Sequence, residues 1–249
     1  MNTSKIAYLY LYGHYGNVEG ITQIRNIQIE LKDHATAYTP TSRTSILSDC
    51  SGSGKHGVIV GSCQSSSDSA RYANCLYIAD GLTNYGKTPT LTMPKEQITM
   101  SCWYKAAVAG YGNYQIVMSA QGESYEMSIT PQGALRTGFK IGGARKCDNA
   151  SHTSILDGNW HMLTTTYDGT SIHRYVDGAL VNGSTAATGE MSGVSAPLLI
   201  GNYNGTTYGA KEASVSDVRI YYTALSEADI KTLYESAASF MSDGSTSAY

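Results

Sequence analysis

The 249-residue sequence is poor in charged residues and has no long apolar run. Lys, Arg, Asp and Glu make up only 15% of the chain and leave a formal net charge of −3. Such a chain lacks the basic footprint that attracts nucleic acids or anionic membrane surfaces. No segment approaches the ~18 consecutive apolar residues of a membrane-spanning helix. We therefore expect neither nucleic acid nor a membrane among the partners of this protein.

Cysteine is also scarce, and its five residues form no CxxC pair, which argues against a zinc site. Cys102 lies in an apolar segment, which predicts a buried free thiol. Cys50 could form a disulfide with Cys63 or with Cys75. The spacing has none of the regularity of a disulfide framework, however, so we favour reduced thiols.

Aromatic residues other than tyrosine are almost lacking, since the chain has 20 Tyr but only 2 Phe and 2 Trp. A tyrosine ring has a polar tip and therefore suits half-exposed positions and contact faces. Two interpretations stay open. Either many of these rings form a contact surface, or tyrosine replaces phenylalanine within the strands.

The segment 158–182 predicts two antiparallel strands joined by a tight turn. Side chains of residues 162–167 alternate between two faces, and those of residues 172–176 do the same. Asp168-Gly169 predicts a type I′ turn, and Asp177-Gly178 turns the chain again. This pattern indicates an all-β protein built from short antiparallel strands.

The rest of the chain predicts one β-sandwich that ends in a short helix. Residues 1–40 hold one or two strands, which form the end of a preceding module or pack on the main body, and residues 41–249 form the sandwich. Ser226 is the expected N-cap of the helix, and Ile230, Leu233 and Tyr234 form its apolar stripe. Other predicted strands cover residues 57–61, 75–79, 98–106, 114–120, 124–130, 135–141, 197–201 and 213–222.

Four segments carry a resemblance to a known family: SDCSGSGKHGVIVG, ITMSCWYKA, DGNWHMLTTTYDGTSIHRYVDGALV and SDVRIYYTALSEADIKTLYES. Together they resemble the laminin-G-like module of the concanavalin A-like lectin/glucanase superfamily, over about residues 45–238. The resemblance implies a jelly roll of two antiparallel sheets. The residues that match the family pattern are Asp49, Gly52, Gly54, His56, Gly57, Trp103, Trp160, His161, Tyr167, Asp168, Gly169, Tyr175, Asp177, Gly178, Asp217 to Tyr221, Ala224, Leu225 and Ile230.

The segments that flank this module carry a second, weaker resemblance. RNIQIELKDHATAYTP, at residues 25–40, and the final SFMSDGSTSAY resemble segments around such modules in bacteriophage tail and virion proteins. This resemblance implies a location in a virion, or otherwise outside the cell. It also implies other virion subunits as partners and a homo-oligomer.

The superfamily includes glucanases, so a hydrolase has to be considered. A retaining glycosidase needs two carboxylates about 5 Å apart. The nearest candidates are Glu123 and Glu126, and a spacing of three residues places them on opposite faces of a strand. We therefore predict that the protein is not an enzyme. We also predict that His161 is a buried, hydrogen-bonded structural residue, and that Trp103 and Trp160 belong to the core.

No cofactor is required by these patterns, but the resemblance makes a Ca²⁺ ion plausible. Ca²⁺ takes oxygen ligands from carboxylates and loop carbonyls, and the loop of Asp49 and the strand of Asp217 are where the family would place it. Ser216 stands where the family often has another Asp, which removes one carboxylate. The alternative is that Asp217 pairs with Arg219 or caps a turn.

Sugar binding is the leading functional interpretation, because loops on a rigid scaffold commonly carry recognition. The loop GNYNGTTYG is the best candidate, with the alternative that NYNG is only a hairpin turn. We predict a module that binds a cell-surface glycan; the alternatives are an architectural virion domain without a ligand and, third, a glycoside hydrolase relative. The candidate binding residues are Asn202, Tyr203, Asn204, Tyr208, Tyr111 and Tyr114, together with Asn113.

Overall fold

The computed structural model describes residues 46–47, 49, 51, 53, 55–66, 75–120, 124–149, 154–181, 184–193, 195–205 and 207–242. All of them lie in the compact unit formed by Arg43–Tyr249. The strands predicted in residues 1–40 lie outside the described residues, so the predicted domain boundary stays a prediction.

The described chain forms two antiparallel sheets, as predicted, and each sheet has eight strands. The first, here called the β8 sheet, has the spatial order β1 (Ile46–Leu47), β2 (Gly57–Val60), β5 (Tyr85–Thr92), β15 (Ser195–Ile200), β7 (Gln115–Ala120), β8 (Tyr125–Ile129), β9 (Leu135–Ile141) and β10 (Ala144–Asn149). The second, the β6 sheet, has the order β13 (Ala179–Leu180), β12 (Ser171–Val176), β11 (His161–Tyr167), β6 (Ile98–Lys105), β16 (Lys211–Tyr221), β4 (Cys75–Asp80) and β3 (Gln64–Ser66), and β14 (Thr185–Ala186) also pairs with β12.

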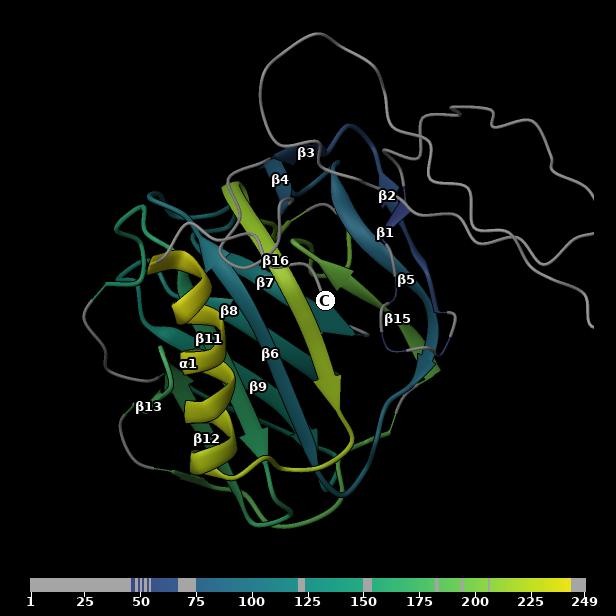
Figure 1. The fold of residues 1–249 in the computed structure, drawn as a ribbon. Coiled ribbons are helices and arrows are strands. Elements are labelled where there is room, and N and C mark those ends of the chain that lie inside the picture. Colours follow the sequence, from purple (N-terminus) through teal and green to yellow (C-terminus); the bar gives the residue numbers. More distant parts are fainter. Residues whose placement is uncertain are drawn as a thin grey trace, which may run out of the picture. The chain divides into compact units, whose positions relative to one another are not determined.

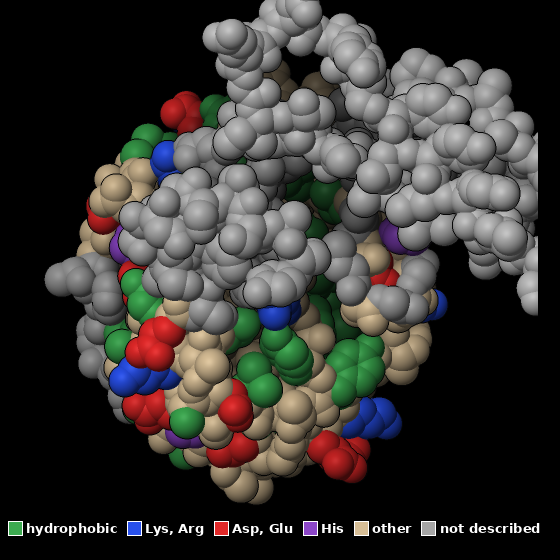
Figure 2. All heavy atoms as spheres, in the orientation of Figure 1, with side chains coloured by type: hydrophobic (Ala, Val, Ile, Leu, Met, Phe, Trp, Pro, Cys, Tyr) green, Lys and Arg blue, Asp and Glu red, His purple; other side chains and the backbone are tan. Residues whose placement is uncertain are grey.

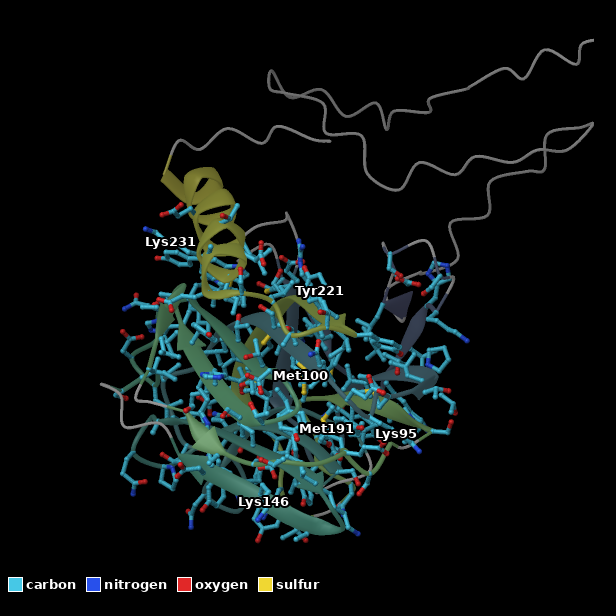
Figure 3. All side chains as sticks on the ribbon, turned by 90° about the horizontal axis from the view of Figure 1, so that it is seen from below. Lys95, Met100, Lys146, Met191, Tyr221 and Lys231 are labelled. Carbon is cyan, nitrogen blue, oxygen red and sulfur yellow. The ribbon has the colours of Figure 1, made fainter. Side chains whose placement is uncertain are left out.

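The two sheets stack as layers, with the β6 sheet in front of the β8 sheet and helix α1 (Glu227–Ser242) across its outer face (Figure 1). Figure 3 shows Met100 between Lys231 of α1 and Lys146 of β10, which lie on opposite sides of the molecule. Met100, Tyr125, Phe139 and other apolar side chains fill the space between the layers and are fully buried. Burial of this alternating apolar face is what holds a β-sandwich together.

The hairpin of β11 and β12 forms with the predicted alternation of faces, but one of its two turns differs from the prediction. At Asp177-Gly178 both residues have positive φ, 53° and 78°, as a type I′ turn requires. At the other turn only Gly169 has positive φ, 97°, so the type I′ prediction for Asp168-Gly169 is wrong. The Asp168 carboxylate instead accepts hydrogen bonds from the amides of Thr170 and Ser171. The turn is therefore centred one residue later in the chain than predicted.

Two of the longer strands of the β8 sheet carry no clear sequence signal and, like the two-residue β1, are not predicted. Strand β5 contains Pro89 and few apolar residues, although it pairs with both β2 and β15. Strand β10 is an edge strand with the sequence ARKCDN, and charged side chains are typical of a protected sheet edge. Tertiary pairing, rather than hydrophobic periodicity, determines both strands.

The predicted free thiols are confirmed for the four described cysteines, Cys63, Cys75, Cys102 and Cys147; Cys50 lies outside the described residues. Cys102 is buried, as predicted, and burial raises the pKa of its thiol well above the usual range. Burial also raises the pKa of Cys63 to about 11. These thiols therefore remain protonated at neutral pH.

Helix α1 begins after Ser226, the predicted N-cap. The amide of Asp229 donates to the Ser226 hydroxyl at 3.2 Å, and the Asp229 carboxylate accepts from the Ser226 amide at 3.1 Å, which is a reciprocal capping box. No helix in the described part of the chain has the length and apolar character needed to cross a membrane.

One face of α1 buries an aromatic group on the β6 sheet, here called the helix cluster. Trp103 is 2% exposed, and its ring stacks on that of Tyr234 with centroids 5.7 Å apart. The predicted core position of Trp103 is thus confirmed, while Trp160 is only half-buried at the margin of the cluster. The helix cluster comprises Trp103, Met162, Tyr175 and Ile230, with Trp160, Leu225, Leu233 and Tyr234 packed against it.

Candidate functional site

The buried side chain of Asn202, one of the predicted binding residues, anchors the loop between β15 and β16. Asn202 is fully buried, and its side-chain amide donates to the carbonyls of Gly81 at 2.6 Å and Gly205 at 3.0 Å. Its side-chain oxygen accepts from the Gly205 amide at 2.9 Å. The Ser119 hydroxyl of β7 also donates to the carbonyls of Asn202 and Tyr203, at 2.9 and 2.7 Å. Asn202 therefore shapes the loop, whereas its neighbour Asn204 is exposed to solvent.

The structure brings the four predicted tyrosines together from two loops that are about 90 residues apart in the sequence. Tyr208 contacts Tyr114 and Tyr203 edge to face, with centroids 6.3 and 5.8 Å away. Tyr111 joins them through its backbone, because its amide donates to the Gly209 carbonyl at 2.9 Å. Tyr208 is 37% exposed and the other three are half-buried. We call Tyr111, Tyr114, Tyr203 and Tyr208 the tyrosine cluster.

A glycine lets the two loops meet closely. Gly112 has a φ of +69°, and a Cβ on it would lie 2.3 Å from Cδ1 of Tyr208. The ring of Tyr208 can therefore rest on the 110–114 turn only because residue 112 has no side chain. The exposed Asn113 follows it with a φ of 73°, a conformation that asparagine tolerates better than most residues.

Three charged side chains form an ion triad next to the tyrosine cluster, on the outer face of the β8 sheet. Glu126 is 1% exposed, and each of its carboxylate oxygens accepts a hydrogen bond from an arginine, Oε1 from Arg136 and Oε2 from Arg145. The Ser128 hydroxyl donates the third hydrogen bond to this carboxylate, at 2.8 Å to Oε1. The Cζ atom of Arg136 lies 4.9 Å from the ring centroid of Tyr114, which links the triad to the cluster.

Strand register explains how the triad assembles. Gly138 of β9 lies between Glu126 of β8 and Cys147 of β10, because it pairs with both. Arg136 is two residues before Gly138, and Arg145 is two residues before Cys147, so all of them share one face. A Cβ on Gly138 would lie only 3.3 Å from Oε2 of Glu126 and 3.4 Å from Nη2 of Arg145. A side chain at this position would therefore require small shifts of these two charged groups.

The ion triad contains Glu126, one of the two candidate glycosidase carboxylates. Glu126 is bound on both oxygens by guanidinium groups, so neither oxygen is open for nucleophilic attack. The other candidate, Glu123, lies outside the described residues. The predicted separation of these two residues by strand alternation therefore stays a prediction.

The candidate metal residues are both engaged within the protein. The carboxylate of Asp49 accepts from the Ser51 amide, the Ser53 hydroxyl and the Lys55 amide, at 2.7–2.8 Å. These bonds, with the serine side chains contributing most, hold the pKa of Asp49 far below its usual range. Asp217 accepts from Nε of Arg219 at 2.8 Å, which is the pairing considered as the alternative to Ca²⁺. Among the described residues no three His, Cys, Asp or Glu side chains form a potential metal site.

His161 is hydrogen-bonded, as its sequence context predicts, but it is half-buried rather than buried. Its Nδ1 lies 2.7 Å from the Asp177 carboxylate and its Nε2 lies 3.2 Å from that of Asp157. The Asp177 bond, more than the Asp157 bond, raises the pKa of His161 above its usual value. Asp177 also accepts from the Met162 amide at 2.8 Å, so the histidine ties the start of β11 to the turn after β12.

Sequence reasoning finds the tyrosines but misses both arginines of the triad. Arg136 and Arg145 lie in or beside strands without any motif, and β10 itself is not predicted. The one available signal is the alternation of β9, which places Arg136, Gly138 and Lys140 on the face opposite the apolar Leu135, Phe139 and Ile141.

The fold is a two-sheet β-sandwich of the jelly-roll type. The chain belongs to the concanavalin A-like lectin/glucanases superfamily, because the laminin G model of that family matches residues 80–231. The predicted superfamily is thereby confirmed, whereas the predicted phage origin stays a prediction. No curated protein matches this sequence.

Several solved structures share the fold. The binding domain of Paraclostridial Mosquitocidal Protein 1 has 15% identity and a TM-score of 0.62, over 76% of this chain and 49% of that one. The ligand binding domain of botulinum neurotoxin serotype D, in complex with N-acetylneuraminic acid, has 17% identity and a TM-score of 0.60 over 76% and 47%. A structure of botulinum neurotoxin type C, whose cell entry depends on two ganglioside molecules, has 15% identity and a TM-score of 0.57 over 76% and 48%. This chain spans about half the length of these structures, and the likeness is one of fold.

Proposed function

We propose that this protein is a non-catalytic carbohydrate-binding or adhesion module that recognises a cell-surface glycan. The observation that carries the proposal is the tyrosine cluster, where rings from two loops meet at the surface on a rigid sandwich. The C–H groups of a sugar pack well on aromatic rings, while the phenol groups and the exposed amide of Asn204 offer hydrogen bonds to its hydroxyls.

Two further observations support binding through these loops. Asn202, Ser119 and Gly112 fix the loop backbones by hydrogen bonds and close contacts, so the site is largely formed before a ligand arrives. One toxin domain of the same fold forms a complex with N-acetylneuraminic acid, and the cell entry of another toxin of this fold depends on gangliosides, which makes a glycan a reasonable ligand class here.

The absence of catalysis is part of the proposal. Its support is that Glu126, the one described member of the candidate acid pair, is bound on both oxygens by arginines. A glycosidase acid or nucleophile has to present a carboxyl group to the glycosidic bond.

The biological setting is also proposed, on the resemblance of the flanking segments alone. We place the module in a phage tail or other virion protein, or otherwise outside the cell. There it would associate with other virion subunits and with further copies of this chain. The measurement that addresses this is whether virions of the source contain the protein.

A glycan array with the purified full chain tests the binding function. We expect selective binding by the wild type, and a loss of at least about fivefold in affinity for Tyr208→Ala, which removes the most exposed ring of the cluster. Tyr222→Ala is the matched control, because Tyr222 is 59% exposed and bonds to the Thr92 carbonyl instead of the cluster. This control is expected to bind like the wild type.

The array also separates the alternatives. Binding to no glycan above background would favour an architectural domain and end the proposal. Equal losses in the Tyr208 and Tyr222 variants would place the site elsewhere. Repeating the array with EDTA and with added Ca²⁺ tests the metal role that the family resemblance implies for Asp49 and Asp217, and that role predicts weaker binding with EDTA.

A further inference from the structure

Gln115 is a fully buried polar residue at the start of β7, directly after Tyr114 of the tyrosine cluster. Its side-chain oxygen accepts from the Tyr104 hydroxyl at 2.8 Å and from the Lys211 amide at 2.9 Å. Its side-chain nitrogen donates to the carbonyls of Val108 at 2.6 Å and Lys211 at 2.7 Å. A glutamine side chain has two donors and two acceptor positions, so these four bonds use its full capacity.

These bonds join the two loops that carry the tyrosine cluster. Val108 lies three residues before Tyr111 in the first loop, and Lys211 lies three residues after Tyr208 in the second. Gln115 bonds to both flanks, so one buried side chain connects segments that are about 100 residues apart in the sequence. The relative position of the two loops therefore depends on this side chain as well as on backbone contacts.

The start of β16 is a place where such support matters. Lys211 pairs with Asp80 of β4, while the pairing of β16 with β6 starts at Ser214. The backbone N–H and C=O of Lys211 both bond to Gln115. The next residue, Glu212, has a φ of +48°, a conformation that persists in a residue other than glycine only where its surroundings hold it. Loss of the Gln115 bonds would allow this segment to relax.

We propose that Gln115 is a positioning residue of the glycan-binding site, which fixes the two loops relative to each other so that the tyrosine rings form one surface before a ligand arrives. This inference rests on the proposed glycan-binding function and adds a buried residue that touches no ligand itself. Groups that are already fixed lose less conformational entropy on binding. Lys211 extends the effect to a ring, since its Nζ lies 5.8 Å from the ring centroid of Tyr111.

The four bonds explain why this position holds glutamine. Asparagine has the same polar groups on a side chain that is one methylene shorter. An ionised glutamate has no donor and would place a carboxylate oxygen against the carbonyls of Val108 and Lys211. Methionine is unbranched and of similar length but makes none of these bonds, so Gln115→Met removes the connection with little change in volume.

The first measurement needs no ligand. The Tyr111 amide donates to the Gly209 carbonyl at 2.9 Å, and this bond spans the two loops. Its hydrogen exchange, followed by NMR on the full chain, reports how often the loops separate. We expect exchange of this amide to be about tenfold faster in Gln115→Met than in wild type. Unchanged exchange in the folded variant would overturn the positioning role.

Thr99→Val is the matched control, because Thr99 is also a fully buried polar residue that anchors a connection. Its hydroxyl donates to the Thr223 carbonyl at 2.8 Å and accepts from the Leu225 amide at 2.9 Å. The anchored connection, from β16 to α1, lies at the opposite end of β16 from Lys211 (Figure 1). Acidic, basic and apolar side chains are interspersed over the surface around α1 (Figure 2), and none of the predicted binding residues lies there. We expect this control to lose thermal stability but to keep the exchange rate of the Tyr111 amide.

The second measurement is affinity. The probe is the glycan of the array that gives the strongest signal with wild type, titrated at a temperature where every variant is folded. We expect Gln115→Met to bind it about fivefold more weakly, and Thr99→Val to bind it like wild type. A role in stability alone would lower the melting temperatures of both variants and leave both affinities unchanged, which would overturn the inference.

A double-mutant cycle with Tyr208→Ala shows whether Gln115 acts through the rings. Two independent losses of about fivefold multiply to about 25-fold. We expect the double variant to lose about tenfold or less, because fixing the position of a ring has no value once that ring is removed. A fully multiplicative loss would contradict action through Tyr208.

Tyr104→Phe replaces Gln115→Met if the latter does not fold, because it keeps Gln115 and removes one bond to its oxygen. We expect exchange of the Tyr111 amide to be about threefold faster and affinity to be about twofold weaker. Wild-type values for both would then overturn the inference and leave glycan binding intact. Wild type that binds no glycan on the array would instead remove the proposed function itself.

Discussion

The helix cluster and the tyrosine cluster are both aromatic groups on the outer faces of the sandwich, yet they differ in what covers them. Trp103 is 2% exposed beneath α1, whereas Tyr208 is 37% exposed on a loop. The first group is packed by a helix of the same chain, and its burial stabilises the fold. The tyrosine cluster lies beside charged side chains and is exposed to solvent. The two aromatic groups therefore have different roles, according to whether the chain covers them.

The largest expected effect concerns stability at the helix cluster. Trp103→Ala removes a buried ring from between the β6 sheet and α1, and we expect the free energy of unfolding to fall by about 4 kcal/mol. Tyr208→Ala is expected to change it by less than about 1 kcal/mol, because the ring is exposed. Urea denaturation followed by circular dichroism measures both. Similar losses in the two variants would show that the clusters do not differ as described.

An intermediate effect is expected where the loop of the tyrosine cluster is anchored. Asn202→Ala leaves the buried Gly81 carbonyl without its donor, and we expect a loss of about 2 kcal/mol in unfolding free energy. Glycan binding should weaken in the same variant, because Tyr203 and Tyr208 lose their fixed positions. Asn204→Ala, at an exposed neighbour, is the control and should stay within about 0.5 kcal/mol of wild type. Unchanged binding by folded Asn202→Ala would contradict the anchoring role.

The smallest expected effect is a pH dependence on the helix side. The carboxylates of Asp177 and Asp157 raise the pKa of His161 above its unfolded value of about 6.5. The protonated form therefore stabilises the folded state, fully below about pH 6.5, and this contribution is lost as the pH rises through the folded pKa. Melting temperatures of wild type and His161→Gln should differ more at pH 5.5 than at pH 8.5.

His173→Gln is the control for that measurement, since Nε2 of His173 lies farther from its carboxylate partner, 3.5 Å from Oδ2 of Asp168. A stability difference between wild type and His161→Gln that grows with pH would contradict the assignment. Glycan binding should be unaffected at either pH, because His161 belongs to the hairpin beside the helix cluster.

Much of the fold follows from local patterns. Strand β9 and the alternation of β11 follow from hydrophobic periodicity, and the start of α1 follows from the capping residue Ser226. Strands β5 and β10 could not be predicted, because Pro89 interrupts the first and the second is charged. The turn at Gly169 shows the same limit, because hydrogen bonds to the Asp168 side chain, and not the dipeptide alone, decide its geometry.

For the candidate site, the sequence determined which loops carry tyrosine and asparagine, since these residues are visible in the printed chain. It also determined the alternation that gives each strand an inner and an outer face. Only the tertiary structure decided that Asn202 faces inward while Tyr208 faces solvent, and that Arg136 and Arg145 meet Glu126 over Gly138. The physical reason is register: a strand fixes its own faces locally, but which side chains become neighbours across a sheet depends on pairing between segments that are distant in the chain.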